Sequence, residues 1–140
     1  MANDSRESEV GSLEAMGQAE LFNFEKLIAY QKALDYIDFV YELTDEFPQY
    51  EIYGMTSQWR RASCSIALNT GEGAGSTDND FKSFLRIAKR SLRECVVCTT
   101  ISFRRKYITK YVYDESRNRL VELAKLNSGL VKSILNKNSK

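Results

Sequence analysis

Two helical patterns joined by a glycine-rich stretch decide the fold predicted for this chain. The first pattern is Ser57-Gln58-Trp59-Arg60-Arg61-Ala62-Ser63-Cys64-Ser65-Ile66. The second is Phe81-Lys82-Ser83-Phe84-Leu85-Arg86-Ile87-Ala88-Lys89-Arg90-Ser91-Leu92-Arg93-Glu94, and Gly71-Glu72-Gly73-Ala74-Gly75 lies between them. In both patterns apolar residues return every three or four positions, the period of one helix face. We expect two neighbouring helices, the first beginning at Met55–Ser57 and ending at the glycines, the second running from Ser76–Asp78 to about Arg105.

Two further helices are expected outside this stretch. One begins near Asn23, a good N-cap, and stops before Pro48, which lacks the N–H that a helix interior needs. The other begins near Thr109 or Asp114 and ends close to residue 136. One Pro and seven Gly in 140 residues are too few for the many turns of an all-β chain. The prediction is an all-α protein, an antiparallel up-down four-helix bundle.

Composition limits the classes of function. Residues 1–20 are polar and acidic and are expected to form a flexible tail before a bundle over residues 21–137, with residues 138–140 as a frayed end. The sequence contains no His, which excludes His-dependent triads and His metal ligands. Three Cys, no secretory signal and no long apolar run predict a cytoplasmic protein with no membrane partner.

Charge is unevenly distributed along the chain, although the whole carries a formal net charge of only +1. Residues 1–57 hold three bases against twelve acids, a net charge of −9. Residues 58–110 hold eleven bases against four acids, a net charge of +7, and residues 111–140 carry +3. An acidic first third and a basic middle point to a charged binding surface that the overall pI conceals.

A row of cations marks the candidate site. Lys82, Arg86, Lys89 and Arg93 step by four, three and four along one helix face, a pattern that suits phosphate backbones. Arg90 lies beside this row, and Arg60 and Arg61 lie on the preceding helix. The candidate nucleic-acid-binding residues are therefore Arg60, Arg61, Lys82, Arg86, Lys89, Arg90 and Arg93. Backbone contact is expected rather than base readout. The alternatives are a solvated face or salt bridges to a neighbouring subunit.

An acidic row lies on the first expected helix, where Asp35, Asp38, Glu42 and Asp45 step by three, four and three. Carboxylates of this kind bind metals or transfer protons, but no second set with His accompanies them. A solvated face is favoured. The sharper alternative is that this row meets the basic row of a neighbouring subunit, since head-to-tail contacts between unlike surfaces build rings.

Three other features receive structural interpretations. Glu72 or Glu94 is expected to pair with Arg60 or Arg61, and Asn69 is expected to be a buried polar residue that fixes helix register. Cys95 and Cys98 share a helix face, but a zinc site needs four ligands, so we expect core packing and no metal or cofactor. The glycine-rich stretch lacks the Lys-Ser/Thr of a phosphate-binding loop.

Aromatic side chains exceed what one small bundle hides easily. They are Tyr30, Tyr36, Phe39, Tyr41, Phe103, Tyr107, Tyr111 and Tyr113. Exposed apolar surface of this extent marks partner surfaces, so a homo-oligomer is expected.

Residues 24–135 resemble the bacterial four-helix-bundle family named for proteins encoded in 23S rRNA intervening sequences, which includes the accessory variability proteins of diversity-generating retroelements. The matching segments are Phe24-Glu25-Lys26-Leu27 with Gln31-Lys32-Ala33, Tyr53-Gly54-Met55-Thr56-Ser57-Gln58-Trp59-Arg60-Arg61-Ala62, Ser65-Ile66, Asn69 with Glu72-Gly73, Phe84-Leu85-Arg86-Ile87-Ala88, Ser91-Leu92 and Glu94. Ala67, Gly71 and Arg90 depart from the family pattern, where Pro, Ala and Gly are common.

The resemblance implies a homopentamer with a basic surface. It also implies nucleic-acid binding for some members and, for the retroelement proteins, a reverse transcriptase partner. Combined with the residues, it predicts a non-enzymatic protein that binds the backbone of RNA or DNA, alone or in an RNA–protein complex. The competing hypothesis is an assembly or scaffold protein whose charged rows serve only the homo-oligomer interface. An enzyme ranks third, because no catalytic constellation is apparent.

Overall fold

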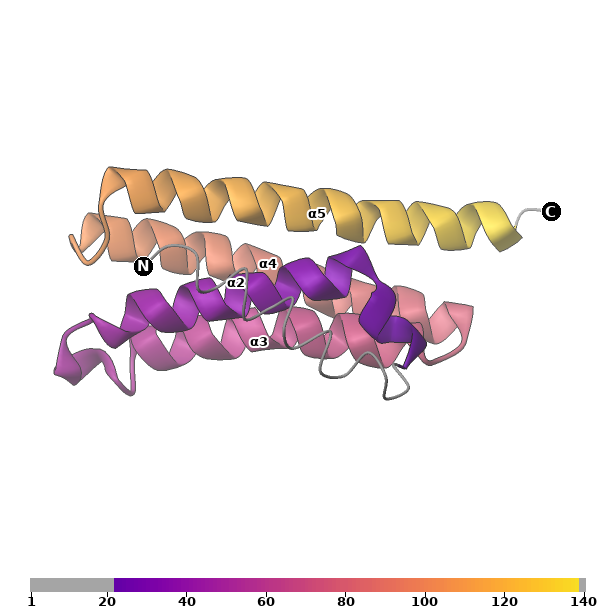
Figure 1. The fold of residues 1–140 in the computed structure, drawn as a ribbon, viewed down its shortest axis with the longest axis horizontal. Helices are drawn as coiled ribbons and strands as arrows, with labels where there is room; N and C mark the ends of the chain where they lie inside the picture. The colour runs from indigo at the N-terminus through magenta and orange to yellow at the C-terminus, as the bar shows by residue number, and fades with distance from the viewer. Residues whose placement is uncertain (1–21, 139–140) are drawn as a thin grey trace.

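Four long helices form the molecule in this computed structural model, which describes residues 22–138 (Figure 1). They are α2 (Ile28–Asp45), α3 (Met55–Ala74), α4 (Asp78–Arg104) and α5 (Lys110–Asn138), with 3-10 turns η1 (Asn23–Lys26) and η2 (Gln49–Glu51). Both α2 and α4 pack against α3 and α5, so consecutive helices are neighbours and α5 closes the ring against α2. This arrangement confirms the predicted all-α up-down bundle. The predicted tail over residues 1–20 lies outside the described residues, as do residues 139–140.

The first helix begins later than predicted. A 3-10 turn occupies Asn23–Lys26, and the α-helix starts only at Ile28 because Leu27 is extended, with φ −68° and ψ 129°. The break turns the Phe24 ring edge-on to the Tyr30 ring, with centroids 5.1 Å apart. Aromatic packing of this kind, with the apolar area it buries, explains why the chain leaves the helical path here.

The second helix ends within the glycine-rich stretch, as predicted, with Gly75 as its C-cap, but the first two glycines do not end it. Helix α3 continues through Gly71 and Gly73 to Ala74. A Cβ atom placed on Gly73 would lie 2.7 Å from Cβ of Phe84, so the missing side chain lets α3 and α4 approach closely. The turn comes at residues 75–77, where Thr77 caps α4 by accepting a hydrogen bond from the Asp80 N–H at 3.2 Å. The start predicted for this helix at Ser76–Asp78 is confirmed.

A line of buried polar groups crosses the apolar core, with one residue from each helix. Trp59 Nε1–H donates to the Tyr36 hydroxyl at 3.1 Å, which in turn is 2.9 Å from Ser116 Oγ, and Ser116 is 2.8 Å from Thr99 Oγ1. We call these four residues the polar quartet. Tyr36 is only 1% exposed, so its assignment to surplus surface aromatics was wrong. Burial raises the pKa of its hydroxyl above the usual value.

The relative alignment of the helices is fixed by residues other than Asn69. Asn69 is only half-buried and donates to the backbone oxygen and hydroxyl of Ser65 on its own helix, at 2.8 and 3.0 Å, so the prediction of a buried register residue was wrong. The buried amide that links two helices is Asn127 on α5, whose Nδ2 donates to the Leu85 carbonyl of α4 at 3.0 Å. Within residues 22–138, no helix has the length and apolar character needed to cross a bilayer.

Candidate nucleic-acid interface

The predicted basic row lies on the outer side of α4. Leu85, Ala88 and Leu92 of this helix are buried in the core. The cations between them point outward, since Arg86, Lys89, Arg90 and Arg93 are exposed and Lys82 is half-buried. The helical period thus separates one element into an apolar face and a basic face.

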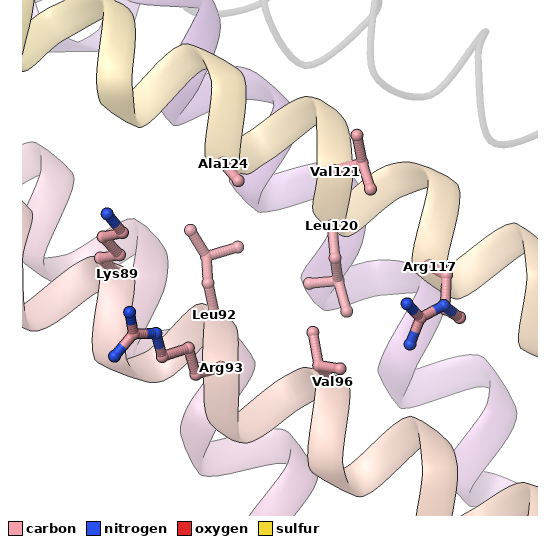
Figure 2. A pocket seen from close by; sticks show the side chains of 8 residues that line it. All are labelled: Lys89, Leu92, Arg93, Val96, Arg117, Leu120, Val121 and Ala124. Atoms are coloured by element: carbon pink, nitrogen blue, oxygen red, sulfur yellow. The ribbon is translucent and has the colours of Figure 1, made fainter.

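A groove runs between α4 and α5 beside this row, and it consists of two hollows. The first has a volume of ≈ 210 Å³ and is lined by Lys89, Leu92, Arg93, Val96, Arg117, Leu120, Val121 and Ala124 (Figure 2). The second has a volume of ≈ 410 Å³ and is lined by Lys82, Leu85, Arg86, Lys89, Asn127, Ser128, Val131, Lys132, Leu135 and Asn136. Both hollows are lined by Lys89, so we treat them as one surface, the α4–α5 groove.

The lining of the α4–α5 groove contains six cations and no carboxylate. The cations are Lys82, Arg86, Lys89, Arg93, Arg117 and Lys132. Four of these cations belong to the predicted row. Arg117 and Lys132 come from α5 and were not among the binding residues predicted from the sequence. Arg117 lies one helical turn before the apolar Val121, at i, i+4, and Lys132 lies one turn after Ser128 of the lining, so both could be assigned to this side of α5 once it was known to pack beside α4.

Most carboxylates of α4 and α5 form ion pairs with cations outside the groove lining. On α4, Asp78 lies 3.7 Å from Lys137 and Glu94 lies 2.8 Å from Arg61. The α5 pairs are Asp114–Lys110 at 2.6 Å, Glu115–Arg119 at 3.0 Å and Glu122–Lys32 at 3.5 Å. Among the acids of these two helices, Asp80 alone has no ion pair with a described residue, and it lies in the first turn of α4. The six groove cations make no ion pair with a described carboxylate, so their positive potential is not cancelled locally.

Arg60 and Arg61 are not brought into the groove. Arg60 Nε donates to Thr44 Oγ1 at 2.8 Å and its NH2 group lies 2.8 Å from Asp45 Oδ1, while its guanidinium covers the Tyr41 ring at 4.5 Å. Arg61 pairs with Glu94, which confirms one of the two acid partners predicted for the arginines. Both arginines therefore connect α3 to neighbouring helices. Of the predicted site residues, the groove brings together Lys82, Arg86, Lys89 and Arg93, while Arg90 is exposed on α4 outside the lining.

The acidic row lies on α2, where Asp38 and Glu42 are exposed. Partial burial and the neighbouring charges of Asp35 and Glu42 raise the pKa of the Asp38 carboxyl above its usual value. Asp45 is the row's only member in an ion pair with a described residue, through Arg60. In the described part of the chain, no three His, Cys, Asp or Glu side chains are grouped in a way that could hold a metal ion.

The two helical cysteines lie in the core. Cys95 and Cys98 are 0% and 5% exposed. Burial, the largest cause in each case, raises the pKa of the Cys95 thiol well above its usual value and that of Cys98 to about 11. Thiols of this kind stay protonated at neutral pH and are poor nucleophiles, which agrees with a packing role.

Comparison with known proteins agrees with this fold. Fold and surface place the chain among small helical bundles with a basic groove. The profile described as "23S rRNA-intervening sequence protein" matches residues 25–129, more than half of the chain. The chain belongs to this family.

A solved structure supports the same fold. It is a protein of unknown function from the S23 ribosomal protein family of Bacteroides thetaiotaomicron, with a TM-score of 0.68 and 24% sequence identity. The similarity covers 75% of this chain and 96% of that one. Among proteins with curated descriptions, none matches this chain.

Proposed function

We propose that this protein binds the sugar–phosphate backbone of nucleic acid through the α4–α5 groove and carries out no chemical reaction. The observation that supports this most is the lining itself, six cations without a carboxylate. Each phosphate that a Lys or Arg neutralises releases counterions, which drives binding. The family description concerns 23S rRNA intervening sequences, which makes RNA the first polymer to test.

The dimensions of the basic row suit an extended ligand. Lys82 and Arg93 are separated along α4 by about 16 Å at ~1.5 Å of rise per residue, and Arg117 and Lys132 continue the charge on α5. A strand lying in the groove would meet cations on both sides. Arg60 and Arg61 are assigned a structural part in this proposal, because their guanidinium groups hold Asp45 and Glu94.

Reversing two groove charges tests the proposal. The Lys89→Glu, Arg93→Glu double variant removes two phosphate contacts, and at about 50 mM salt we expect its affinity for a fluorescent single-stranded RNA to fall by about 50-fold. Fluorescence anisotropy measures the change. The matched control is the Lys26→Glu, Lys106→Glu double variant, which alters net charge equally at two exposed positions outside the groove and is expected to bind almost as the wild type does.

Two results would contradict the proposal. One is the absence of RNA binding by the wild-type protein at low salt. The other is an affinity that the groove variant retains and the control variant does not.

A homo-oligomeric assembly is the second candidate function. It is favoured by the exposed carboxylates of α2, which are complementary to the groove of another copy, and by large exposed apolar side chains such as Leu68 and Tyr111, 60% and 78% exposed. Head-to-tail contacts between these unlike surfaces would form a ring, with a pentamer as the family-based expectation. If the groove double variant dissociates the assembly in light scattering and the wild type binds no RNA, the groove is a subunit interface.

A further inference from the structure

The first hollow of the α4–α5 groove is more apolar than a phosphate site requires. Five of its eight lining residues are Leu92, Val96, Leu120, Val121 and Ala124. Val121 is 50% exposed, so part of this apolar surface faces solvent. Phosphates gain nothing from contact with aliphatic side chains, whereas a planar apolar group would remove this surface from water.

We propose that this hollow receives one unstacked nucleobase, so that the polymer bound in the groove is single-stranded. The inference rests on the proposed function and specifies its ligand. In a duplex the bases are paired and stacked inside the helix, and only their edges are accessible. A base turned out of a single strand presents a flat apolar face to Val121 and Ala124 while its phosphates stay at the rim.

The arrangement of the cations fits this occupant. In Figure 2, Lys89 and Arg93 lie at one end of the apolar side chains and Arg117 lies at the other. Guanidinium planes stack on bases, and ammonium groups bind phosphate as point charges. A strand can therefore bring a phosphate to Lys89, place its base over the aliphatic floor and bring the next phosphate to Arg117.

The volume and the lining of the first hollow limit which part of a ligand it can hold. The volume of ≈ 210 Å³ is below the ~300–1,000 Å³ of pockets for drug-sized ligands, so the hollow suits one base and not a stacked pair. No amide or hydroxyl side chain is part of its lining. Base edges thus meet few directional partners, and we expect weak dependence on base identity.

Oligonucleotides that lack bases test the inference on the unaltered protein. We expect a 20-nucleotide single strand to bind about tenfold more tightly than an abasic strand of equal length, and more tightly than a 20-base-pair duplex, in the same low-salt buffer. Equal affinity for the normal and abasic strands, or tighter binding of the duplex, would overturn base insertion while leaving backbone binding intact. Failure of every polymer to bind would instead overturn the proposed function, and the inference with it.

A variant that fills the hollow provides the second test. Ala124→Leu adds volume at a half-buried lining position and leaves all six cations in place. We expect the preference for normal over abasic strands to disappear while affinity for the abasic strand is unchanged. Ser133→Leu, at an exposed position of α5 outside the groove lining, is the matched control and should keep the preference. Loss of the preference in both variants, or in neither, contradicts the assignment of the base to this hollow.

Discussion

Tyr36 illustrates how single residues determine which bundle this sequence forms. Its hydroxyl accepts the Trp59 indole hydrogen and contacts Ser116, which reaches Thr99, so each helix supplies one member of the polar quartet. Apolar side chains pack in many registers, but buried polar groups must find their partners. The quartet is therefore satisfied in this helix alignment, and a shifted alignment would leave its groups unpaired.

Replacing Tyr36 tests this role. Tyr36→Phe removes the hydroxyl and leaves the Trp59 N–H buried without its acceptor, so we expect the free energy of unfolding to fall by about 1–3 kcal/mol. Urea denaturation followed by circular dichroism measures it. Tyr41→Phe is the matched control on the same helix, because Tyr41 is 40% exposed, and its change should stay within about 0.5 kcal/mol. A Tyr36→Phe protein as stable as the wild type would show that the quartet does not stabilise the bundle.

Individual residues also show which features helical spacing does not predict. Tyr36 is placed among the surplus aromatics by the sequence because the periodic pattern alone does not decide which of several overlapping stripes on a helix faces the core. Asn69 occupied a position on the expected seam, yet its amide bonds to Ser65 on its own helix. Hydrogen-bond partners depend on side-chain rotamers and neighbouring helices, which spacing does not reveal.

At the scale of elements, the contact between α3 and α4 depends on a glycine inside a helix. Glycine usually marks a helix end, and the sequence predicts that role for Gly71, Gly73 and Gly75, of which only Gly75 is the C-cap. At Gly73 the absence of a side chain permits the contact with α4, since a Cβ there would approach the Phe81 ring at 2.8 Å as well as Cβ of Phe84. Such a close approach is invisible until both helices are placed.

Two glycine-to-alanine changes should have opposite effects on the free energy of unfolding. Gly73→Ala pushes a methyl group into Phe84, so we expect a loss of about 1–2 kcal/mol despite the better helix propensity of alanine. Gly129→Ala, also in a helix but with no heavy atom beyond its own local helix backbone within 4 Å of the added Cβ, should gain up to about 1 kcal/mol. Thermal and urea unfolding of both proteins measure the pair. Equal effects would show that the two helices adjust to the methyl group without cost.

The basic row and the groove differ in how far sequence could predict them. The positions of Lys82, Arg86, Lys89 and Arg93 on one face follow from the helical period alone, and the structure confirms that face. The groove requires a second wall, and Arg117 and Lys132 became part of it only because α5 packs against α4. The aliphatic side chains of the first hollow likewise come from two helices, since Leu92 lies on α4 and Val121 lies on α5.

At the scale of the molecule, charge is separated between faces of the bundle. Helices α2 and α4 each neighbour α3 and α5, so the acidic side of α2 and the basic side of α4 belong to non-consecutive helices. Ion pairs occupy most carboxylates of α4 and α5, which leaves the groove positive although the net charge of the chain is only +1. The same separation permits either a polyanion or the acidic face of a second copy in the groove.

The salt dependence of RNA affinity tests the central claim most directly. Six groove cations that each neutralise one phosphate predict a slope of about −4 when log affinity is plotted against log salt, at ~0.7 per contact with a single strand. Anisotropy titrations of the wild-type protein over a range of salt concentrations give this slope. For the Lys89→Glu, Arg93→Glu protein the account predicts a slope about 1.4 shallower. A wild-type affinity that does not change with salt, or the same slope in both proteins, would contradict it.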